Sequence, residues 1–418
     1  MSDFLTLLPP TEALHQLLRA LPVVPSLPEF IDTKCSLGRV VAEPVFAPHP
    51  LPTFPRSTVD GYAVQATDTY GASDSLPAYL KIAGEIMMGA EANFALILGY
   101  CALIHTGGML PDGADAVVMI EHTQASHTGE IEILHSVAVG ENVLQVGEDV
   151  ATGDEVIPAG TRVRPAEIGG LMALGLTKVA VVRKPRIGII SSGDEIIPPE
   201  ILLQAGQVHD INAYTLSALI EDCGGVPVRY GIIPDQAEAL HTASAQALME
   251  CDAVVITAGS SASARDLTAQ IINAIGQPGV LVHGVNIRPG KPTILGVCNN
   301  KAVIGLPGNP VSALVVASLF VVPVVESLLR LRYSTGLSRK TLGPSTRARL
   351  AVNIPSQAGR EDWIPVRLID TPAGAMAEPL FGKSNLIFTL VRADGMIYIP
   401  PDITGIIAGE TVEVIPLE

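Results

Sequence analysis

Aromatic residues are scarce in this chain of 418 residues, where phenylalanine, tyrosine and tryptophan together make up 4%. Hydrophobic residues nevertheless account for 48%, and the mean hydropathy is +0.40. The apolar excess therefore consists of alanine, valine, isoleucine and leucine, the mixture that fills parallel β-sheets covered by helices. A chain of this length exceeds one ordinary hydrophobic core, so we expect roughly two to four domains.

Positive charge is also scarce, with 26 lysines and arginines against 42 aspartates and glutamates and a formal net charge of −16. This balance argues against nucleic acid as a main partner. A small anion can still bind to such a chain, but only through a local cluster of lysine, arginine and backbone N–H groups.

No segment is predicted to enter a membrane. The N-terminus lacks a basic region followed by an apolar core, which is the pattern of a signal peptide. The most hydrophobic run, residues 311–325, falls short of the ~20 residues that span a bilayer, contains Pro323 and is followed by Glu326. We therefore expect a buried core helix, no membrane partner and a cytoplasmic protein.

Cysteine is sparse as well, and the five cysteines are scattered, odd in number and free of any C-x-x-C pair. This usage indicates reduced thiols, as in the cytoplasm, and excludes a disulfide framework and a cysteine zinc site. The nine histidines show no metal-ligand spacing either.

The first half of the chain is predicted to contain one early helix and then short strands. Residues 11–20 have a helical pattern that Thr11 would cap. Residues 60–145 carry short β-like runs separated by glycine, aspartate and proline, and turns with one helix follow over residues 147–175. Proline is dense over residues 44–55, which marks a domain boundary.

The second half alternates apolar strands with helical segments. Residues 212–223 are a predicted helix that Gly224 would end, and Asp235 would cap the next helix with Glu238 at the capping-box position. Alternation of this kind predicts a mostly parallel sheet, whose ligands bind beyond the carboxyl ends of the strands. Residues 348–416 return to short strands, which predicts a small β domain.

The expected fold class is therefore multi-domain α/β plus β, with a central three-layer α/β domain. The expected division is a discontinuous N-terminal and linker domain over residues 1–45 and 146–182, an inserted β-rich domain over residues 46–145, the α/β domain over residues 183–332, and the C-terminal β domain over residues 333–418.

Five loops flank the predicted strands of the α/β region, and they would gather at one edge of the sheet. They cover residues 191–196, 208–214, 257–266, 288–292 and 306–313. Their glycines and serines allow close backbone approach, and Lys291 suits a phosphate or oxyanion. They and the turn before the capped helix also offer hard oxygen ligands, namely Asp194, Glu195, Asp235 and Asp266.

The loop over residues 306–313 opens the apolar helix, so its backbone N–H groups would favour an anion. Any one such loop is usually a plain turn, but all five at one edge favour a binding site without naming its substrate. The stretch TAGSSASARD, residues 257–266, could cradle an anion or simply turn the chain, and the residue types alone leave both readings open.

Ordered sequence blocks over some 300 residues resemble the molybdopterin molybdenumtransferase family, of the MoeA and gephyrin E-domain type. The blocks are residues 37–64 with the core S-x-x-D-G-Y-A, residues 104–123, and residues 142–161. They are followed in the family's order by SSGDE, DIN, PGKP and GLPGNPVSA. One block would be weak, but the ordered series is specific.

The resemblance implies an enzyme of molybdenum cofactor biosynthesis that inserts molybdate into adenylylated molybdopterin and releases AMP, with Mg²⁺ involved. It also implies an elongated homodimer, in which each active site lies between the α/β domain of one subunit and domains of the other. We also expect an adenylyltransferase as a partner.

The resemblance also assigns roles to individual residues. The residues implied in catalysis are Asp60, Thr106, Asp149, Glu195, Asp235 and Asp266, and Asp266 and Glu195 are the implied metal ligands. The residues implied in substrate binding are Ser260, Ser261, Lys291, Pro292, Pro307, Asn309, Pro310, Arg360 and Ser384.

The chain departs from the family pattern at three positions. Ala258 and Ser263 stand where the family usually has glycine, and Val59 stands where it usually has methionine. If positions 258 and 263 require a positive φ, a side chain there costs on the order of 1 kcal/mol or more. Three functions therefore compete: an active molybdenum-insertion enzyme, a catalytically weakened paralogue that binds the pterin as a scaffold, and a molybdopterin adenylyltransferase.

Overall fold

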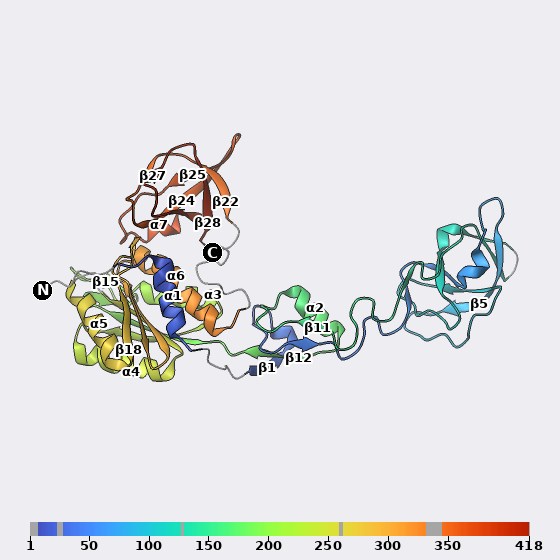
Figure 1. Cartoon of the computed structure of the whole chain (residues 1–418), viewed down its shortest axis with the longest axis horizontal. Helices are drawn as coiled ribbons and strands as arrows, with labels where there is room; N and C mark the ends of the chain where they lie inside the picture. Colours follow the sequence, from blue (N-terminus) through green and yellow to red (C-terminus); the bar gives the residue numbers. More distant parts are fainter. Residues whose placement is uncertain (1–6, 23–27, 127–128, 259–261, 332–344, 418) are drawn as a thin grey trace.

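The computed structural model describes an elongated chain with units at both ends and a smaller unit between them (Figure 1). The described residues are 7–22, 28–126, 129–258, 262–331 and 345–417. The α/β unit and the C-terminal β unit lie together at one end, the linker unit lies in the middle, and the inserted β-rich unit lies at the other end. This arrangement confirms the expected multi-domain α/β plus β fold.

The α/β unit is built on a six-stranded, mostly parallel sheet. Its strands, in spatial order, are β16 (Val226–Ile233), β13 (Arg186–Ser192), β17 (Ala253–Ala258), β21 (Lys301–Pro307), β20 (Ile294–Cys298) and β18 (Pro278–His283). The first four are mutually parallel, whereas β20 runs antiparallel to both of its neighbours. The carboxyl ends of the parallel strands and the loop before β20 therefore share one edge.

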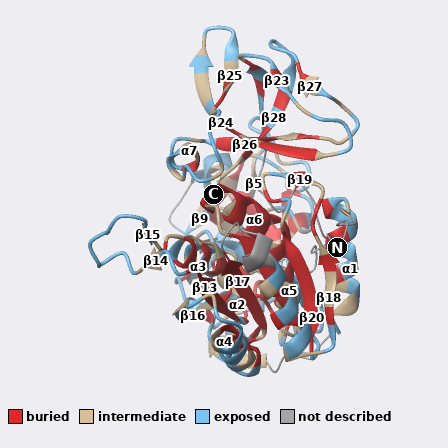
Figure 2. Ribbon diagram, turned by 90° about the vertical axis from the view of Figure 1, so that its left-hand side faces the viewer, coloured by how far each residue is buried: buried red, intermediate tan, exposed pale blue. Residues whose placement is uncertain are grey.

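Helices cover both faces of this sheet and make the predicted three layers. Successive strand residues point to opposite faces, so Ile189 packs with helices α1 (Pro10–Ala20), α3 (Asn212–Asp222) and α6 (Pro310–Leu328). Ile190 packs on the other face with α4 (Ala237–Glu250) and α5 (Ala262–Ile275). Figure 2 shows the strands of this sheet as the most deeply buried part of the unit.

Helix α6 is the apolar segment that the sequence predicts as a core helix. By length and composition it could cross a membrane, but 72% of its most hydrophobic window is buried inside the structure. Phe320 at its centre is fully buried among residues of the central sheet and of α3. The hydrophobicity of α6 is therefore explained by packing within this chain.

Helix α1 differs from its prediction in its start and in its place. It begins at Pro10, with Pro9 as its N-cap and no side-chain cap, so the predicted Thr11 cap is wrong. A proline in the first turn needs no cap for its own nitrogen, because it has no N–H to leave unpaired. The helix packs against α6 and β20, and thus lies with the α/β unit although the expected division placed residues 1–45 with the linker.

The predicted cap of a further helix is also wrong, and helix α5 begins before Asp266. Helix α4 begins at Ala237 with Gln236 as N-cap, because the Asp235 carboxylate accepts a hydrogen bond from Ser192 Oγ at 2.6 Å instead. Helix α5 begins at Ala262, so Asp266 lies inside the helix. The predicted end of α3 is confirmed, since Gly224 follows it with φ +99°.

The linker unit contains two strand pairs and one helix. Strand β1 (Pro28–Asp32) pairs with β12 (Lys178–Val182), β2 (Val45–Phe46) pairs with β11 (Glu155–Ile157), and α2 spans Pro165–Ala173. The chain then passes from β12 directly into β13 of the α/β unit.

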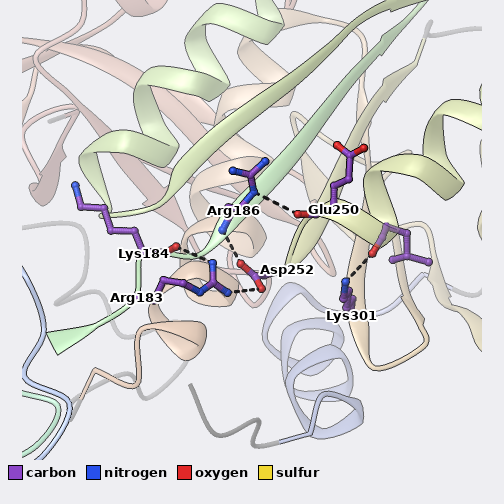
Figure 3. A network of polar contacts seen from close by, with 7 residues as sticks. Arg183, Lys184, Arg186, Glu250, Asp252 and Lys301 are labelled. Carbon is purple, nitrogen blue, oxygen red and sulfur yellow. Dashed lines mark hydrogen bonds and ion pairs between the residues drawn. The ribbon is translucent and has the colours of Figure 1, made fainter. Parts of the chain in front are cut away.

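A polar network fixes this passage at the amino-terminal edge of the central sheet (Figure 3). The Asp252 carboxylate accepts hydrogen bonds from Arg183 Nη2 at 2.8 Å and from the Arg186 backbone nitrogen at 2.7 Å. Arg186 Nε and Lys301 Nζ donate to carbonyls in the last turn of α4, groups that a helix end leaves unpaired. These cations are therefore occupied within the α/β unit, at the opposite edge of the sheet from the carboxyl ends of its strands.

The inserted unit is a six-stranded sheet. Its spatial order is β7 (Ala116–Met119), β4 (Gly61–Val64), β6 (Tyr100–Ile104), β5 (Ala78–Ile86), β9 (Glu130–Ile133) and β8 (Thr123–Ala125). Strands β3 (Arg56–Ser57) and β10 (Val143–Leu144) pair where the chain enters and leaves this unit. Val59 packs against the core of the sheet, so the methionine that it replaces in the family pattern has an apolar substitute.

The C-terminal unit is a second β structure, and one strand of its sheet comes from the α/β unit. Its order is β19 (Ile287–Arg288), β24 (Glu361–Thr371), β25 (Gly374–Pro379), β22 (Thr346–Leu350), β28 (Thr411–Pro416) and β26 (Gly395–Ile399), and β24 also pairs with β26. Strand β19 belongs to the loop between β18 and β20. Backbone hydrogen bonding therefore joins the two units beside the carboxyl edge of the central sheet.

Candidate active site

A cleft of about 620 Å³ opens between the α/β unit and the C-terminal unit. One wall comes from residues 287–292 and 307–312 of the α/β unit, and the other from residues 354–365 and 380–389 of the C-terminal unit. Six of the residues implied in substrate binding line it: Lys291, Pro292, Pro307, Asn309, Arg360 and Ser384. Pro310 does not line the cleft, because it is buried as the first residue of α6.

The loop that carries Lys291 is held in one conformation. Gly290 has φ +118°, and a Cβ added to it would overlap Val316 Cγ2 of α6. Thr293 Oγ1 donates to the Gly290 carbonyl at 2.6 Å, and the Val285 backbone nitrogen donates to the Lys291 carbonyl at 3.0 Å. The exposed Lys291 side chain therefore extends from a rigid turn.

Arg360 lies on the wall opposite Lys291, and its guanidinium is held by the carboxylate of Asp362. Arg360 Nε and Nη2 donate to the two oxygens of Asp362 at 2.7 and 3.0 Å. The Asp362 side chain is buried, and Ser356 Oγ donates to its Oδ2 at 3.0 Å. The guanidinium is thus fixed as part of the cleft wall.

Ser384 is docked onto the start of α6. Its Oγ accepts a hydrogen bond from Asn309 Nδ2 at 3.0 Å, which leaves its own O–H free to donate to a ligand. Its carbonyl accepts from the Val311 backbone nitrogen at 3.1 Å. The prediction that the backbone N–H groups at this helix start serve an anion is therefore wrong for Val311, whose N–H joins the two units instead.

Two cations of the cleft, Arg288 and Lys383, do not appear among the residues proposed from the sequence. Both side chains are exposed, and each lies within three residues of a proposed site residue. With Lys291 and Arg360, they make a cationic cleft in a chain of net charge −16. The only signal was position, since Arg288 directly precedes PGKP and Lys383 directly precedes Ser384, and a surface lysine or arginine is too common for that signal to decide.

The proposed carboxylates at the sheet edge lie outside this lining. Glu195 is exposed in the turn after β13, Asp235 follows β16, and Asp266 is exposed on α5. Asp194 Oδ1 accepts from the Asp235 backbone nitrogen at 3.2 Å. Within the described ranges, no three histidine, cysteine, aspartate or glutamate side chains lie close enough to hold a metal ion by themselves.

Two buried polar atoms at the same edge have no hydrogen-bond partner among the residues that the structure describes. They are Ser191 Oγ, near the end of β13, and Asn212 Oδ1, at the start of α3. Asn212 Nδ2 donates to the Gly308 carbonyl at 2.9 Å. Neither atom was singled out from the sequence, because a serine at a strand end and an asparagine at a helix start have local structural explanations.

The altered stretch at residues 257–266 is compatible with the backbone around it. Ala258 is the last residue of β17 and pairs with Pro307 in extended conformation, and Ser263 lies within helix α5. Neither position requires a positive φ, so the predicted strain is wrong for both residues. Ser260 and Ser261 lie outside the described residues.

Asp60 and Thr106 form a separate pair in the inserted unit. The Asp60 Oδ1 atom accepts from the Thr106 backbone nitrogen at 2.7 Å and from Thr106 Oγ1 at 3.0 Å. These hydrogen bonds, the backbone one foremost, hold the pKa of Asp60 below its ordinary value. The inserted unit lies at the far end of the chain from the cleft (Figure 1), so one chain does not bring this pair to Lys291 and Arg360.

Asp149 lies apart from both groups. It is exposed in the segment that leaves the inserted unit, where its backbone nitrogen donates to the Leu51 carbonyl at 3.0 Å. The residues implied in catalysis are thus distributed over three places in one chain: the inserted unit, the connecting segment and the sheet edge.

Comparison with known proteins places the whole chain in one family. Residues 8–175 match the MoeA N-terminal region (domain I and II), residues 188–327 match the probable molybdopterin binding domain, and residues 347–417 match the MoeA C-terminal region (domain IV). A putative molybdopterin biosynthesis protein of Methanocaldococcus jannaschii is 36% identical, over 92% of this chain and 91% of that protein. The molybdopterin molybdenumtransferase of Bacillus subtilis is 32% identical, over 93% of this chain and 89% of that protein.

A solved structure agrees with these relatives. The crystal structure of a MoeA molybdopterin biosynthesis protein from Pyrococcus horikosii superimposes with a TM-score of 0.82 at 36% identity, covering 99% of this chain and 100% of that chain. The chain therefore belongs to the MoeA family of molybdopterin biosynthesis proteins.

Proposed function

We propose that this chain is a molybdopterin molybdenumtransferase, which inserts molybdate into adenylylated molybdopterin and releases AMP. The observation that carries the proposal is the convergence of Lys291, Arg360 and Ser384 on one cleft between two units. The names of the full-length relatives point to the same activity.

The cleft suits a tetrahedral dianion such as molybdate. Lys291 supplies a compact positive charge, Arg360 supplies directed N–H groups, and Ser384 supplies a hydroxyl whose oxygen is already held by Asn309. Hydrogen bonds from charged donors to an oxyanion are short and roughly twice as strong as neutral ones. The net charge of −16 would repel a dianion elsewhere on the chain, so a local cationic cleft is required.

The sheet-edge carboxylates suit a magnesium ion that the substrate helps to bind. Mg²⁺ is usually held by one or two carboxylates and completed by water and substrate phosphate oxygens. Glu195 and Asp266 are exposed oxygen donors on loops or helices at this edge, which fits that mode. When bound there, the ion would neutralise negative charge on the phosphates while the phosphoanhydride bond breaks.

We further propose that the protein acts as a homodimer in the cytoplasm and receives its substrate from an adenylyltransferase. The support for a dimer is the separation of the Asp60–Thr106 pair from the cleft within one chain. A symmetric dimer would allow the inserted unit of one copy to complete the cleft of the other.

Two other functions are less well supported. A molybdopterin adenylyltransferase would not need the regions that match MoeA domains I, II and IV. The weakened paralogue was favoured by strain at Ala258 and Ser263, and neither residue occupies a strained conformation.

The experiment is AMP release from adenylylated molybdopterin by the purified protein, with and without molybdate. The expected result is release that depends on molybdate and on added Mg²⁺. AMP release that is unchanged when molybdate is omitted would show that the cleft does not serve this reaction.

A further inference from the structure

The further inference concerns Asp362, a residue behind the cleft that does not line it. Asp362 is the second residue of β24, and its side chain is 1% exposed. Strand pairing holds its backbone on both sides, against Arg288 of β19 and Ile399 of β26. Few carboxylates in the described part of the chain are fixed so completely, and a buried carboxylate normally has a partner that requires it.

The partner is Arg360, which does line the cleft. Arg360 lies in the bend directly before β24, and both oxygens of Asp362 accept from its guanidinium. The Arg360 side chain is 24% exposed, so it reaches the cleft while its inner edge is bound. Asp362 itself is held from behind by Ser356 Oγ.

The hydrogen bonds leave part of the guanidinium available. Arginine has five N–H groups, of which two are directed to Asp362 and one to Gln357 Oε1 at 3.4 Å. Two N–H groups therefore remain for a ligand, in a direction set by the Asp362 carboxylate.

We propose that Asp362 is a positioning residue that makes the cleft selective for tetrahedral oxyanions over spherical anions. The inference rests on the proposed binding of molybdate in this cleft. Asp362 cancels much of the charge of Arg360 for any anion, whatever its shape. What it leaves is a pair of directed N–H groups, which match the separated oxygens of an oxyanion and have no match on chloride.

Loss of Asp362 therefore has two opposite effects on binding. The added net charge strengthens attraction for every anion, and the freed guanidinium loses its fixed direction, which weakens only the oxyanion. Ordering one long side chain at a binding surface is worth up to about tenfold in affinity. A fall in the ratio of molybdate affinity to chloride affinity reports the second effect, because the added charge attracts the molybdate dianion more strongly than chloride and can only raise the ratio.

The test measures both affinities for the full-length protein. Molybdate binding is titrated by calorimetry, and chloride affinity is obtained from its competition with molybdate. Asp362→Asn should lower the ratio by up to about tenfold, and Ser356→Ala, which removes only the hydrogen bond to Asp362, should lower it by a smaller factor. Glu378→Gln is the matched control, because it removes the carboxylate from another arginine pair, Arg367 of β24 with Glu378 of β25, outside the cleft.

A double variant separates positioning from a general structural effect. If Asp362 acts through the guanidinium, Arg360→Lys should lower the ratio by itself, and adding Asp362→Asn should lower it no further. If Asp362→Asn lowers the ratio as much in the Arg360→Lys protein as in the native protein, Asp362 acts independently of Arg360. Thermal unfolding of each variant checks the fold, and if Asp362→Asn does not fold, Ser356→Ala and Arg360→Lys carry the test.

The outcomes distinguish this inference from the proposed function. A native protein that prefers molybdate, with a lower ratio in Asp362→Asn, supports both. A native preference that Asp362→Asn and Ser356→Ala leave unchanged overturns the positioning role while the proposed function stands. A native protein with no preference for molybdate over chloride overturns both.

Discussion

The rigidity of the Lys291 loop can be tested at Gly290 with a glycine of the same unit as control. Gly290→Ala forces a Cβ into a conformation with φ +118° and into overlap with Val316 Cγ2. Gly231→Ala, at the bulge in β16, meets a similar backbone penalty at φ +85° but open space within 4 Å. The pair therefore differs mainly in the overlap.

The magnitudes follow from these two contributions. An unfavourable φ costs on the order of 1–3 kcal/mol at either position. Overlap in a packed region adds about 1–3 kcal/mol, so Gly290→Ala should lower the free energy of unfolding of the α/β unit by roughly 2–6 kcal/mol. Gly231→Ala should lower it by the φ contribution alone.

The assay is urea unfolding followed by circular dichroism, together with molybdate titration of the folded variants. Trp363 lines the cleft and is the single tryptophan of the chain, so its fluorescence reports on the site. Gly290→Ala should weaken molybdate binding because the relieved overlap displaces Lys291, and Gly231→Ala should not. Equal stability and equal binding in the two variants would show that the loop adapts freely, which would refute the account of a fixed Lys291.

Lys291→Ala should weaken molybdate binding in calorimetry and leave the melting temperature nearly unchanged, since an exposed cation contributes little to folding. A large fall in melting temperature with unchanged molybdate binding would show that Lys291 has a structural role. Asp266→Asn should fold normally, because Asp266 lies inside α5 and does not cap the helix. The variant should lose AMP release by about tenfold or more, because asparagine lacks the negative charge proposed to hold Mg²⁺. Full turnover would remove Asp266 from the site. The hydrogen bonds from Thr106 lower the pKa of Asp60 from its ordinary value of 3.8. Their contribution to the stability of the folded protein is therefore complete above that pH, and it is lost as the pH falls through the lowered pKa. Thr106→Val should raise the pKa of Asp60 in an NMR titration, and an unchanged pKa would contradict the role of the hydroxyl.

The central sheet was largely predictable from the sequence, for a physical reason. Runs such as DAVVITA and KAVIGLP are apolar on both faces and bounded by turns, which is the pattern of a buried parallel strand. Strand β20 lacks this signal, because it closely follows the PGKP turn and runs antiparallel, so no helix separates it from the next strand in the sequence.

The helix starts were poorly predictable because long-range contacts decide them. Asp235 has the right spacing for a cap, but its carboxylate is bound by Ser192, 43 residues earlier in the chain. Asn309 is an N-cap residue whose side chain bonds Ser384 of another unit instead of its own helix. Local sequence contains neither partner.

The sequence predicted which residues line the cleft, but it did not predict how they are arranged. The resemblance named Lys291, Arg360 and Ser384, and the cleft contains all three. No sequence pattern pointed to Asp362, because its role depends on its burial and on the direction of the Arg360 guanidinium. The separation of Asp60 from the cleft is a property of the elongated chain, which no local pattern encodes.

The most direct test of the central claim, an active site shared between two chains, is AMP release by a co-expressed mixture of Asp60→Asn and Lys291→Ala chains. Each variant alone lacks one half of every site. In a symmetric dimer, half of randomly paired molecules combine the two variants, and each of these has one intact site, so the mixture should regain about a quarter of the native rate. A mixture no more active than the two variants measured separately would contradict the shared site.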